Sequence, residues 1–328
     1  MVSIQNIDTQ KYVSDMFSSA QWDALKHLID EINELKRDKN AVILGHNYMT
    51  PDIFHCVSDI TGDSLKLAQE AARAEADIIV QAGVHFMAET SKILCPDKTV
   101  LIPDPKAGCS LAEGITAKDV QLLKEKYPGV PIVTYVNTTA EVKAESDICC
   151  TSSNAAKITR KLYEQGHKEV LLIPDQFLAE NVAAEVPEVK VLTYKGSCIV
   201  HERFTADDMK RLRKQNPDAV ILAHPECPRD VVEEVDYAGS TAQMDQFIKQ
   251  NQPAKAILVT ECSMSDNLKA VNQNVEFISG CQLCPYMKMI TLPKIRDSLL
   301  NMTHEVHVDP TIAAKAKIAV DKMLEMSA

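Results

Sequence analysis

The chain has 328 residues, of which 45% are hydrophobic and 25% charged, and its formal net charge is −11. Such a composition is typical of a folded globular protein with more than one core, and the acidic balance argues against nucleic acid or an anionic membrane as a main partner. The N-terminal segment has no basic stretch followed by an apolar core, and no run reaches the roughly 18 apolar residues of a membrane span. We therefore expect a cytoplasmic protein.

Predicted elements recur along the chain at a fixed interval. After a helix expected over residues 22–38, apolar runs predict three equivalent strands that end near His46, Tyr135 and His224, and both gaps between these residues are 89. Each strand precedes an amphipathic helix and a second strand. The helices are expected over 64–76, 154–166 and 241–251, the second strands over 76–83, 168–175 and 254–261, and a further strand leads into each cysteine loop. The second strands are β-branched and show no alternation, which indicates parallel sheets buried on both faces.

A period near 88 residues is long enough for a small α/β unit with its own core. The repeat therefore predicts an α/β fold of three similar three-layer αβα domains, with parallel sheets arranged about a pseudo-threefold axis. We place the domains at 1–115, 116–203 and 204–285, because helices with threonine caps are predicted just after the first two cysteine loops. The segment 286–328 ends in a helix beginning at Pro310 and is expected to pack back on the first domain.

Three cysteines share the period of the strands. Cys109, Cys198 and Cys284 stand 89 and 86 residues apart, each in a loop that contains glycine. Functional groups collect at the carboxyl ends of parallel strands, so three units facing one axis would bring these thiols into one site. Zinc would need a fourth ligand or a water, whereas an iron–sulfur cubane on three cysteines leaves one iron open as a Lewis acid. Both metal sites remain open at this point.

The other cysteines lack that repeated position. Without a secretion signal, the ten cysteines predict reduced thiols rather than a disulfide framework. Cys281 fits the interval from Cys198 less well than Cys284, so Cys284 is taken as the ligand and Cys281 as a neighbour or a disulfide partner. The remaining six are expected to be small buried apolar residues or bystanders: Cys56, Cys95, Cys149, Cys150, Cys227 and Cys262.

Three hydroxyl side chains also recur, since Ser64, Ser152 and Thr241 begin helical stretches 88 and 89 residues apart. Serine and threonine are ordinary N-caps. At equivalent positions beside a shared cavity they could instead bind the carboxylate or phosphate oxygens of a substrate, because helix N-termini attract anions. Ser153 adjoins Ser152 and could take its place.

The predicted strand ends supply further polar groups that can orient a substrate and move protons. The first two ends carry His46, Asn47 and Tyr48, then Tyr135 and Asn137, and the third carries His224 and Glu226. His201 and Glu202, just beyond Cys198, are weaker candidates for a supporting role. His304 and His307 are expected on the surface.

The motifs between about residue 40 and residue 295 together resemble those of quinolinate synthase. They are HNY at 46–48, GDSLKLA at 62–68, DPKAGCSLA at 104–112, YVNTTAEVKA at 135–144, TSSNA at 151–155, GSCIVHERF at 196–204, AHPEC at 223–227, GSTAQM at 239–244 and CPYMKMITLPKI at 284–295. So many motifs in order make a chance match very improbable. One departure is Ile278, which stands where some family members have the first cysteine of a C-x-x-C-x-x-C run.

The resemblance implies an oxygen-sensitive enzyme of NAD biosynthesis that condenses iminoaspartate with dihydroxyacetone phosphate to form quinolinate, releasing phosphate and water. It also implies a [4Fe–4S] cluster on Cys109, Cys198 and Cys284, and functional coupling to an aspartate oxidase or dehydrogenase that supplies the imine. By motif, the family's active-site residues match His46, Tyr48, Ser64, Tyr135, Asn137, Ser152, His224, Glu226 and Thr241. Among these, Glu226 is expected to act as a base, His224 to assist it, and Tyr48 to act as an acid.

Two rival classes of protein remain. One is a zinc or iron hydrolase or lyase that acts on another small polyanion. The other is a non-catalytic iron–sulfur sensor, for which the acidic charge and the lack of a recognition helix are unfavourable. Iron and sulfide bound to the purified protein would exclude a zinc site. Formation of quinolinate would exclude a non-catalytic sensor.

Overall fold

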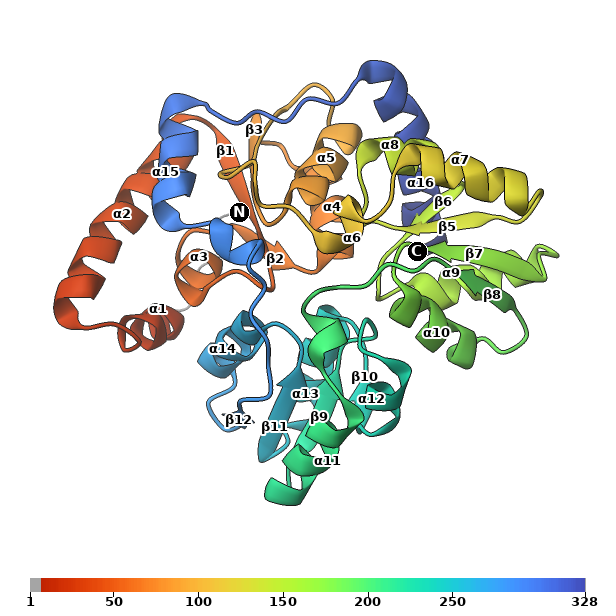
Figure 1. Ribbon diagram of the computed structural model, residues 1–328. Coiled ribbons are helices and arrows are strands. Elements are labelled where there is room, and N and C mark those ends of the chain that lie inside the picture. Colours follow the sequence, from red (N-terminus) through yellow and green to blue (C-terminus); the bar gives the residue numbers. More distant parts are fainter. Residues whose placement is uncertain (1–6, 328) are drawn as a thin grey trace.

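The computed structural model describes residues 7–327 and contains three parallel sheets of four strands each. The first sheet has the order β2-β1-β3-β4, the second β6-β5-β7-β8 and the third β10-β9-β11-β12, so the same topology occurs three times. Figure 1 shows the sheets in three lobes that surround the middle of the molecule. The predicted α/β class is confirmed, whereas the pseudo-threefold axis and the domain boundaries stay predictions.

The strands follow one another at the predicted spacing. Their bounds are β1 Ala41–His46, β2 Ile60–Gly62, β3 Ile78–Ala82, β4 Thr99–Leu101, β5 Ile132–Tyr135, β6 Ile148–Cys150, β7 Glu169–Ile173, β8 Lys190–Thr193, β9 Val220–Ala223, β10 Tyr237–Ala238, β11 Lys255–Val259 and β12 Glu276–Ile278. The sequence predicted three strands for each unit and missed the edge strands β2, β6 and β10. These have only two or three residues, too few to show a hydrophobic period.

Helices cover both faces of the sheets. Their bounds in the three repeated units are α3 Pro51–Cys56, α4 Ser64–Arg73, α5 His85–Leu94, α6 Ser110–Glu113, α7 Ala117–Lys126, α8 Ala140–Ala144, α9 Ala155–Glu164, α10 Gln176–Glu185, α11 Ala206–Gln215, α12 Arg229–Glu233, α13 Thr241–Asn251 and α14 Cys262–Val271. The three-layer arrangement is clearest in the third unit. There Ile221 and Ile257 pack against one helical layer, while Leu222 and Leu258 pack against the other. Successive strand residues point to opposite faces, so both faces of this sheet are buried.

The predicted N-terminal signals of two helices are confirmed. Thr116 caps α7 and Thr205 caps α11, and each forms a reciprocal capping box with the aspartate three residues later. Both helices begin shortly after a cysteine loop, as the sequence predicted.

The remaining helices are α1 Ile7–Ser14, α2 Ser19–Asp38, α15 Leu292–Asn301 and α16 Pro310–Ser327. The expectation that 286–328 packs on the first unit is correct for α15, which lies against α2 and β3, but wrong for most of α16. The connection after α15 crosses the edge of the first sheet, where Val306 N donates to Val100 O. Past that edge, α16 packs mainly against α8, β6 and α9 of the second unit and only partly against α5 (Figure 1).

The acid stability of the fold should depend on His55 in α3. Burial lowers the pKa of His55 from 6.5 to about 4, against a weaker opposing effect of the Asn267 backbone. Between these values the unfolded chain binds the extra proton, so the free energy of unfolding falls as the pH is lowered through that window. We expect about 3 kcal/mol of stability to be lost from this source between roughly pH 6.5 and pH 4.

Urea unfolding at pH 7 and pH 5 would check this prediction. His55→Gln should show a clearly smaller loss of stability at the lower pH than the parent protein, whereas His27→Gln, at an exposed position of α2, should not. An equal loss in the parent and His55→Gln would contradict the prediction.

Candidate active site

The site begins at three equivalent strand ends. His46 is the last residue of β1, Tyr135 is the last residue of β5, and His224 directly follows β9. All three side chains line one cavity, although they come from three different sheets. The structure therefore brings together in one place what the sequence showed only as a repeat.

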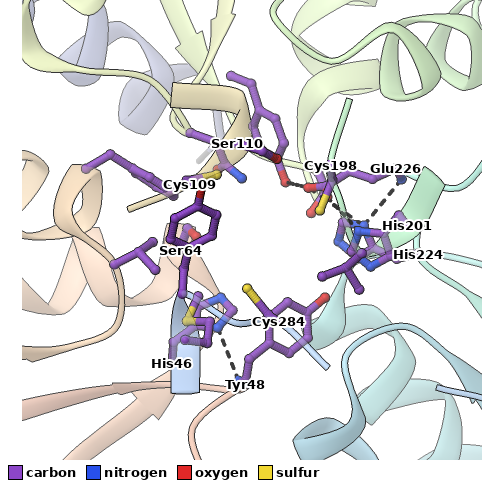
Figure 2. Close-up of a pocket in the computed structure, with 18 of the residues that line it drawn as sticks. His46, Tyr48, Ser64, Cys109, Ser110, Cys198, His201, His224, Glu226 and Cys284 are labelled. Atoms are coloured by element: carbon purple, nitrogen blue, oxygen red, sulfur yellow. Dashed lines mark hydrogen bonds and ion pairs between the residues drawn. The ribbon is translucent and has the colours of Figure 1, made fainter. Parts of the chain in front are cut away.

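The twelve residues predicted as cluster ligands or active-site residues all line this cavity, whereas Asn47, another strand-end candidate, does not and donates its Nδ2 to Thr241 Oγ1 at 2.8 Å. The twelve are His46, Tyr48, Ser64, Cys109, Tyr135, Asn137, Ser152, Cys198, His224, Glu226, Thr241 and Cys284. Figure 2 shows side chains from the three units facing this common space. Their individual roles remain predictions. Ser153 does not line this cavity, and its hydroxyl is hydrogen-bonded to Thr151 Oγ1 at 2.8 Å, which favours Ser152 as the substrate contact.

The three recurring hydroxyls are not the helix caps. Asp63 caps α4 through its carboxylate and Ser240 caps α13 through its hydroxyl, so Ser64 and Thr241 are the first residues of their helices. Ser152 lies in the turn before α9, which begins after Asn154. Capping therefore does not explain these hydroxyls, and their positions suit contacts with an anion in the cavity.

The three repeated cysteines share one local structure. Each stands just before a short helix: α6 after Cys109, η1 (His201–Arg203) after Cys198 and η2 (Met287–Met289) after Cys284. Burial raises the pKa of all three thiols, that of Cys109 to about 12. Backbone N–H groups two and three residues further along the chain oppose this rise in pKa, and so favour the thiolate, at each position.

These thiols suit a metal group. Figure 2 shows the sulfur atoms of Cys109, Cys198 and Cys284 on different sides of the same space. Three soft sulfur ligands with converging directions, each with backbone N–H groups that stabilise the thiolate, fit an iron–sulfur cluster. A second group of three possible ligands, Cys198, His201 and Glu226, has its donor atoms within 4.8 Å of one another. The last two of these already bind each other, as described next.

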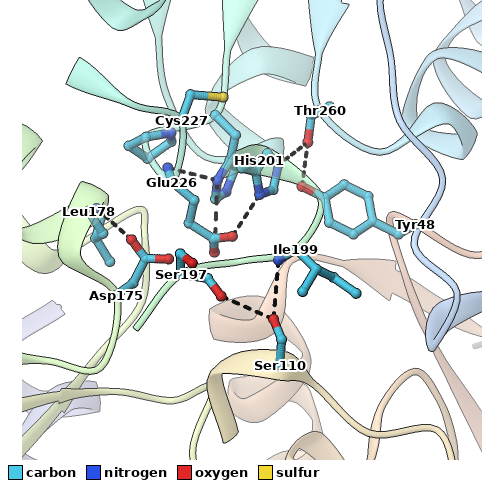
Figure 3. Close-up of polar contacts among 12 residues, drawn as sticks. Tyr48, Ser110, Asp175, Leu178, Ser197, Ile199, His201, Glu226, Cys227 and Thr260 are labelled. Carbon is cyan, nitrogen blue, oxygen red and sulfur yellow. Dashed lines mark hydrogen bonds and ion pairs between the residues drawn. The ribbon is translucent and has the colours of Figure 1, made fainter. Parts of the chain in front are cut away.

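A buried hydrogen-bond network surrounds Glu226 (Figure 3). Tyr135 donates its hydroxyl to Glu226 Oε1 at 2.5 Å, and Glu226 Oε2 lies 2.7 Å from His201 Nδ1. On the other side of the ring, His201 Nε2 is hydrogen-bonded to Thr260 Oγ1 at 2.9 Å, and the Tyr48 hydroxyl lies 2.6 Å from the same oxygen. One chain of hydrogen-bonding groups thus joins all three units.

The network fixes the charge of Glu226. Burial alone would raise the pKa of this carboxyl, but His224 and His201 nearby and the hydrogen bonds from His201 and Tyr135 outweigh burial, so its pKa lies below the usual range. Glu226 is therefore a carboxylate at neutral pH. Burial and the charge of Glu226 raise the pKa of Tyr48 and Tyr135 well above 10, so both phenols keep their protons.

His46 and His224 have the same environment in two units. The backbone N–H of Tyr48 points to His46 Nδ1 at 3.2 Å, and that of Glu226 points to His224 Nδ1 at 3.3 Å. Burial lowers the pKa of His46 to about 4 and of His224 to about 3, so both rings are neutral. Because Nδ1 accepts in each ring, Nε2 carries the proton and can donate to a bound substrate.

Two residues of this network were missed or undervalued from the sequence. His201 was given only a supporting role, yet it is buried, lines the cavity and binds Glu226 directly. Thr260 was not considered, because it follows β11 at a position where the other two units have no hydroxyl residue. Cys198, three residues earlier in the chain, was the available signal for His201, whereas Thr260 had none. His304 and His307 are exposed, as expected.

The expected roles of two other cysteines change. Cys262 and Cys281 form a disulfide, so the expectation that Cys262 is a bystander is wrong, while the expectation that Cys281 could be a disulfide partner is correct. The bond joins the start of α14 to the loop that carries Cys284. The other five cysteines without a repeated position are buried free thiols, as predicted.

Comparisons with known proteins give matches over most of the chain. The sequence profile of the family described as "Quinolinate synthetase A protein" matches residues 30–325. A protein of Sinorhizobium fredii named quinolinate synthase is 57% identical over 314 residues, which is 96% of this chain and 86% of the relative. Another of that name from Xylella fastidiosa is 59% identical over 90% of this chain and 86% of its own length. A third, from Caulobacter vibrioides, is 52% identical over 99% of this chain and 89% of its own length.

Among residues 7–327, no helix combines the length and the apolar character needed to cross a bilayer. Profile and relatives both extend over nearly the whole repeated region, including the three cysteine loops and the three strand ends. The chain therefore belongs to the quinolinate synthase family, whose members are enzymes of NAD biosynthesis.

Proposed function

We propose that this enzyme condenses iminoaspartate with dihydroxyacetone phosphate to form quinolinate, with release of phosphate and water. The main support is a single cavity in which three equivalent cysteine loops meet a buried network of carboxylate, imidazole and hydroxyl groups. Family membership supports the product, since the relatives are named for quinolinate.

Cys109, Cys198 and Cys284 would hold a [4Fe–4S] cluster. When bound, the cluster supplies a Lewis acid with one open coordination position, which can stabilise developing negative charge. The chain itself provides the thiolates and the short helices whose N–H groups favour them. Because one iron of the cluster would have no protein ligand, we also expect the enzyme to be sensitive to oxygen.

Binding of the two anionic substrates would rest on neutral donors. Among the described residues that line the cavity there is no lysine or arginine. Hydroxyls at the starts of helices, the ring N–H groups of His46 and His224, and Asn137 remain as partners for carboxylate and phosphate oxygens. Neutral donors of this kind can orient a polyanion. Because none of them carries a positive charge, they do not form an ion pair with the phosphate product.

Proton transfers would depend on Glu226. The two hydrogen bonds that Glu226 accepts, from Tyr135 and from His201, lower its basicity, so a substrate must displace one of them before Glu226 can remove a proton. His224 stacks on His201 with ring centroids 4.6 Å apart and would assist this step. Tyr48, protonated and bonded to Thr260, would donate a proton to the departing hydroxide.

Anaerobic reconstitution with iron and sulfide, followed by an assay for quinolinate from dihydroxyacetone phosphate and freshly generated iminoaspartate, tests the proposal. Quinolinate should form only when both substrates are present. A loaded cluster without product would instead support chemistry on another polyanion. Because iminoaspartate is unstable, we also propose functional coupling in the cytoplasm to an aspartate oxidase or dehydrogenase.

A further inference from the structure

A buried asparagine links the second and third units next to Glu226. Asn181 lies on α10 of the second unit, and its Nδ2 donates to the carbonyl oxygens of Pro225 and Cys227, both at 2.9 Å. These two carbonyls belong to the residues on either side of Glu226. One amide group thus holds the backbone on both sides of the residue whose carboxylate enters the cavity.

The same arrangement links the third and first units next to Tyr48. Asn267 lies on α14, and its Nδ2 donates to the carbonyl oxygens of Asn47 at 3.1 Å and Met49 at 2.8 Å. Tyr48 stands between these two residues. Asn181 and Asn267 both lie eight residues after the end of a central strand, β7 and β11 respectively.

The interface between the first and second units has a charged counterpart. Glu89 lies on α5, seven residues after the end of β3, and its Oε2 accepts from the backbone N–H of Ala140 at 3.1 Å. Lys143 is fully buried beside it and donates to the carbonyl of Thr138, next to Asn137. Each of the three interfaces therefore has a buried polar group that holds a loop after β1, β5 or β9.

The orientation of the two amides is fixed by their partners. Exchanging the nitrogen and oxygen of Asn181 or Asn267 would place an oxygen against two carbonyl oxygens. In the present orientation, Oδ1 of both residues is buried without a hydrogen-bond partner among the described residues. Such an unsatisfied acceptor is unfavourable for stability. These residues are therefore poorly explained as elements of stability alone.

We propose that Asn181 and Asn267 are positioning residues that orient Glu226 and Tyr48, respectively, by fixing the backbone on both sides of each. The inference rests on the proposed roles of Glu226 and Tyr48 in forming quinolinate. It adds two residues that lie outside the cavity and act only through the residues they hold.

The test compares Asn181→Ala and Asn267→Ala with Asn272→Ala. Asn272 is the matched control, because it is also buried and follows α14 directly, but its amide donates only within its own helix, to Leu268 O at 2.8 Å. We expect kcat for quinolinate to fall about 10- to 100-fold in the first two variants, with little change in KM. Iron content should stay at the parent level, and kcat of Asn272→Ala should be unchanged.

A double-mutant cycle separates positioning from a structural role. If Asn181 acts through Glu226, Asn181→Ala should lower kcat far less in a Glu226→Gln background than in the parent. The same should hold for Asn267→Ala in a Tyr48→Phe background. Asn181→Leu and Asn267→Leu preserve side-chain shape and remove the unsatisfied oxygen, so they provide folded variants should an alanine variant fail to fold.

Full kcat in the Ala and Leu variants, additive losses in the double mutants, or an equal loss in Asn272→Ala would overturn the proposal. Failure of the proposed function is a different result, because the reconstituted parent protein would then form no quinolinate. In that case a crystal structure of Asn181→Leu still decides the inference. A shift of the Glu226 side chain away from Tyr135 and His201 in this variant would support the positioning role. An unchanged position of Glu226 would overturn it.

Discussion

Glu226→Gln is expected to lower kcat about 1,000-fold, within the range found for removal of a general base. The amide is the same size as the carboxylate but carries no charge and cannot accept a proton in the way the proposed reaction requires. Glu226 is buried between the Tyr135 hydroxyl and His201 Nδ1, so no other carboxylate can take over from the same position. Steady-state assays of the reconstituted variant, with iron determined in the same samples, would measure the effect.

The matched control for this substitution is Glu202→Gln. Glu202 lies only one residue beyond His201 but is exposed, and its carboxylate accepts a hydrogen bond from the Ser197 hydroxyl. This variant should keep its activity. Glu226→Gln with near-parental kcat would show that the base lies elsewhere in the cavity, whereas loss of its iron would show a structural effect on the cluster.

Replacing any one of the three period-related cysteines by alanine is expected to abolish turnover, with a loss of more than about 1,000-fold, because the Lewis acid would be missing or misplaced. Cys109, Cys198 and Cys284 come from three different units, so none can replace another. Iron and sulfide content after anaerobic reconstitution should fall well below the parent value in each variant. The visible absorption of the cluster should fall with it.

Cys281→Ala is the control for this series. Cys281 lies three residues before Cys284 and is joined to Cys262, so a general effect on the loop would appear in both variants. We expect Cys281→Ala to load iron at the parent level. A full cluster in Cys284→Ala, or an equal loss in Cys281→Ala, would contradict the assignment of Cys284 as ligand.

The sequence predicted the repeated α/β architecture because the central strands are buried on both faces and read as uninterrupted apolar runs. The run ending at Val259 is an example, since all its residues after Lys255 are buried. Strands at the edge, such as Tyr237–Ala238, are too short to be recognised in this way. The packing position of α16 could not be predicted from the sequence either, because it depends on where the chain crosses the edge of the first sheet.

The sequence predicted those site residues that recur at the repeat interval. His46, Tyr135 and His224 share one interval, and the cavity confirms that they lie together. Thr260 has no counterpart in the other units, so its place between His201 and Tyr48 became visible only in the structure. Pairing of Cys262 with Cys281 likewise depends on the close approach of the start of α14 to the Cys284 loop, which no period in the sequence reports.

A crystal structure of the anaerobically reconstituted protein, soaked with dihydroxyacetone phosphate, would show both the cluster ligands and the substrate site. We expect one [4Fe–4S] cluster bound by Cys109, Cys198 and Cys284, with the ligand's phosphate contacting hydroxyls among Ser64, Ser152 and Thr241. Metal bound instead by Cys198, His201 and Glu226, or a ligand bound outside this cavity, would contradict this expectation.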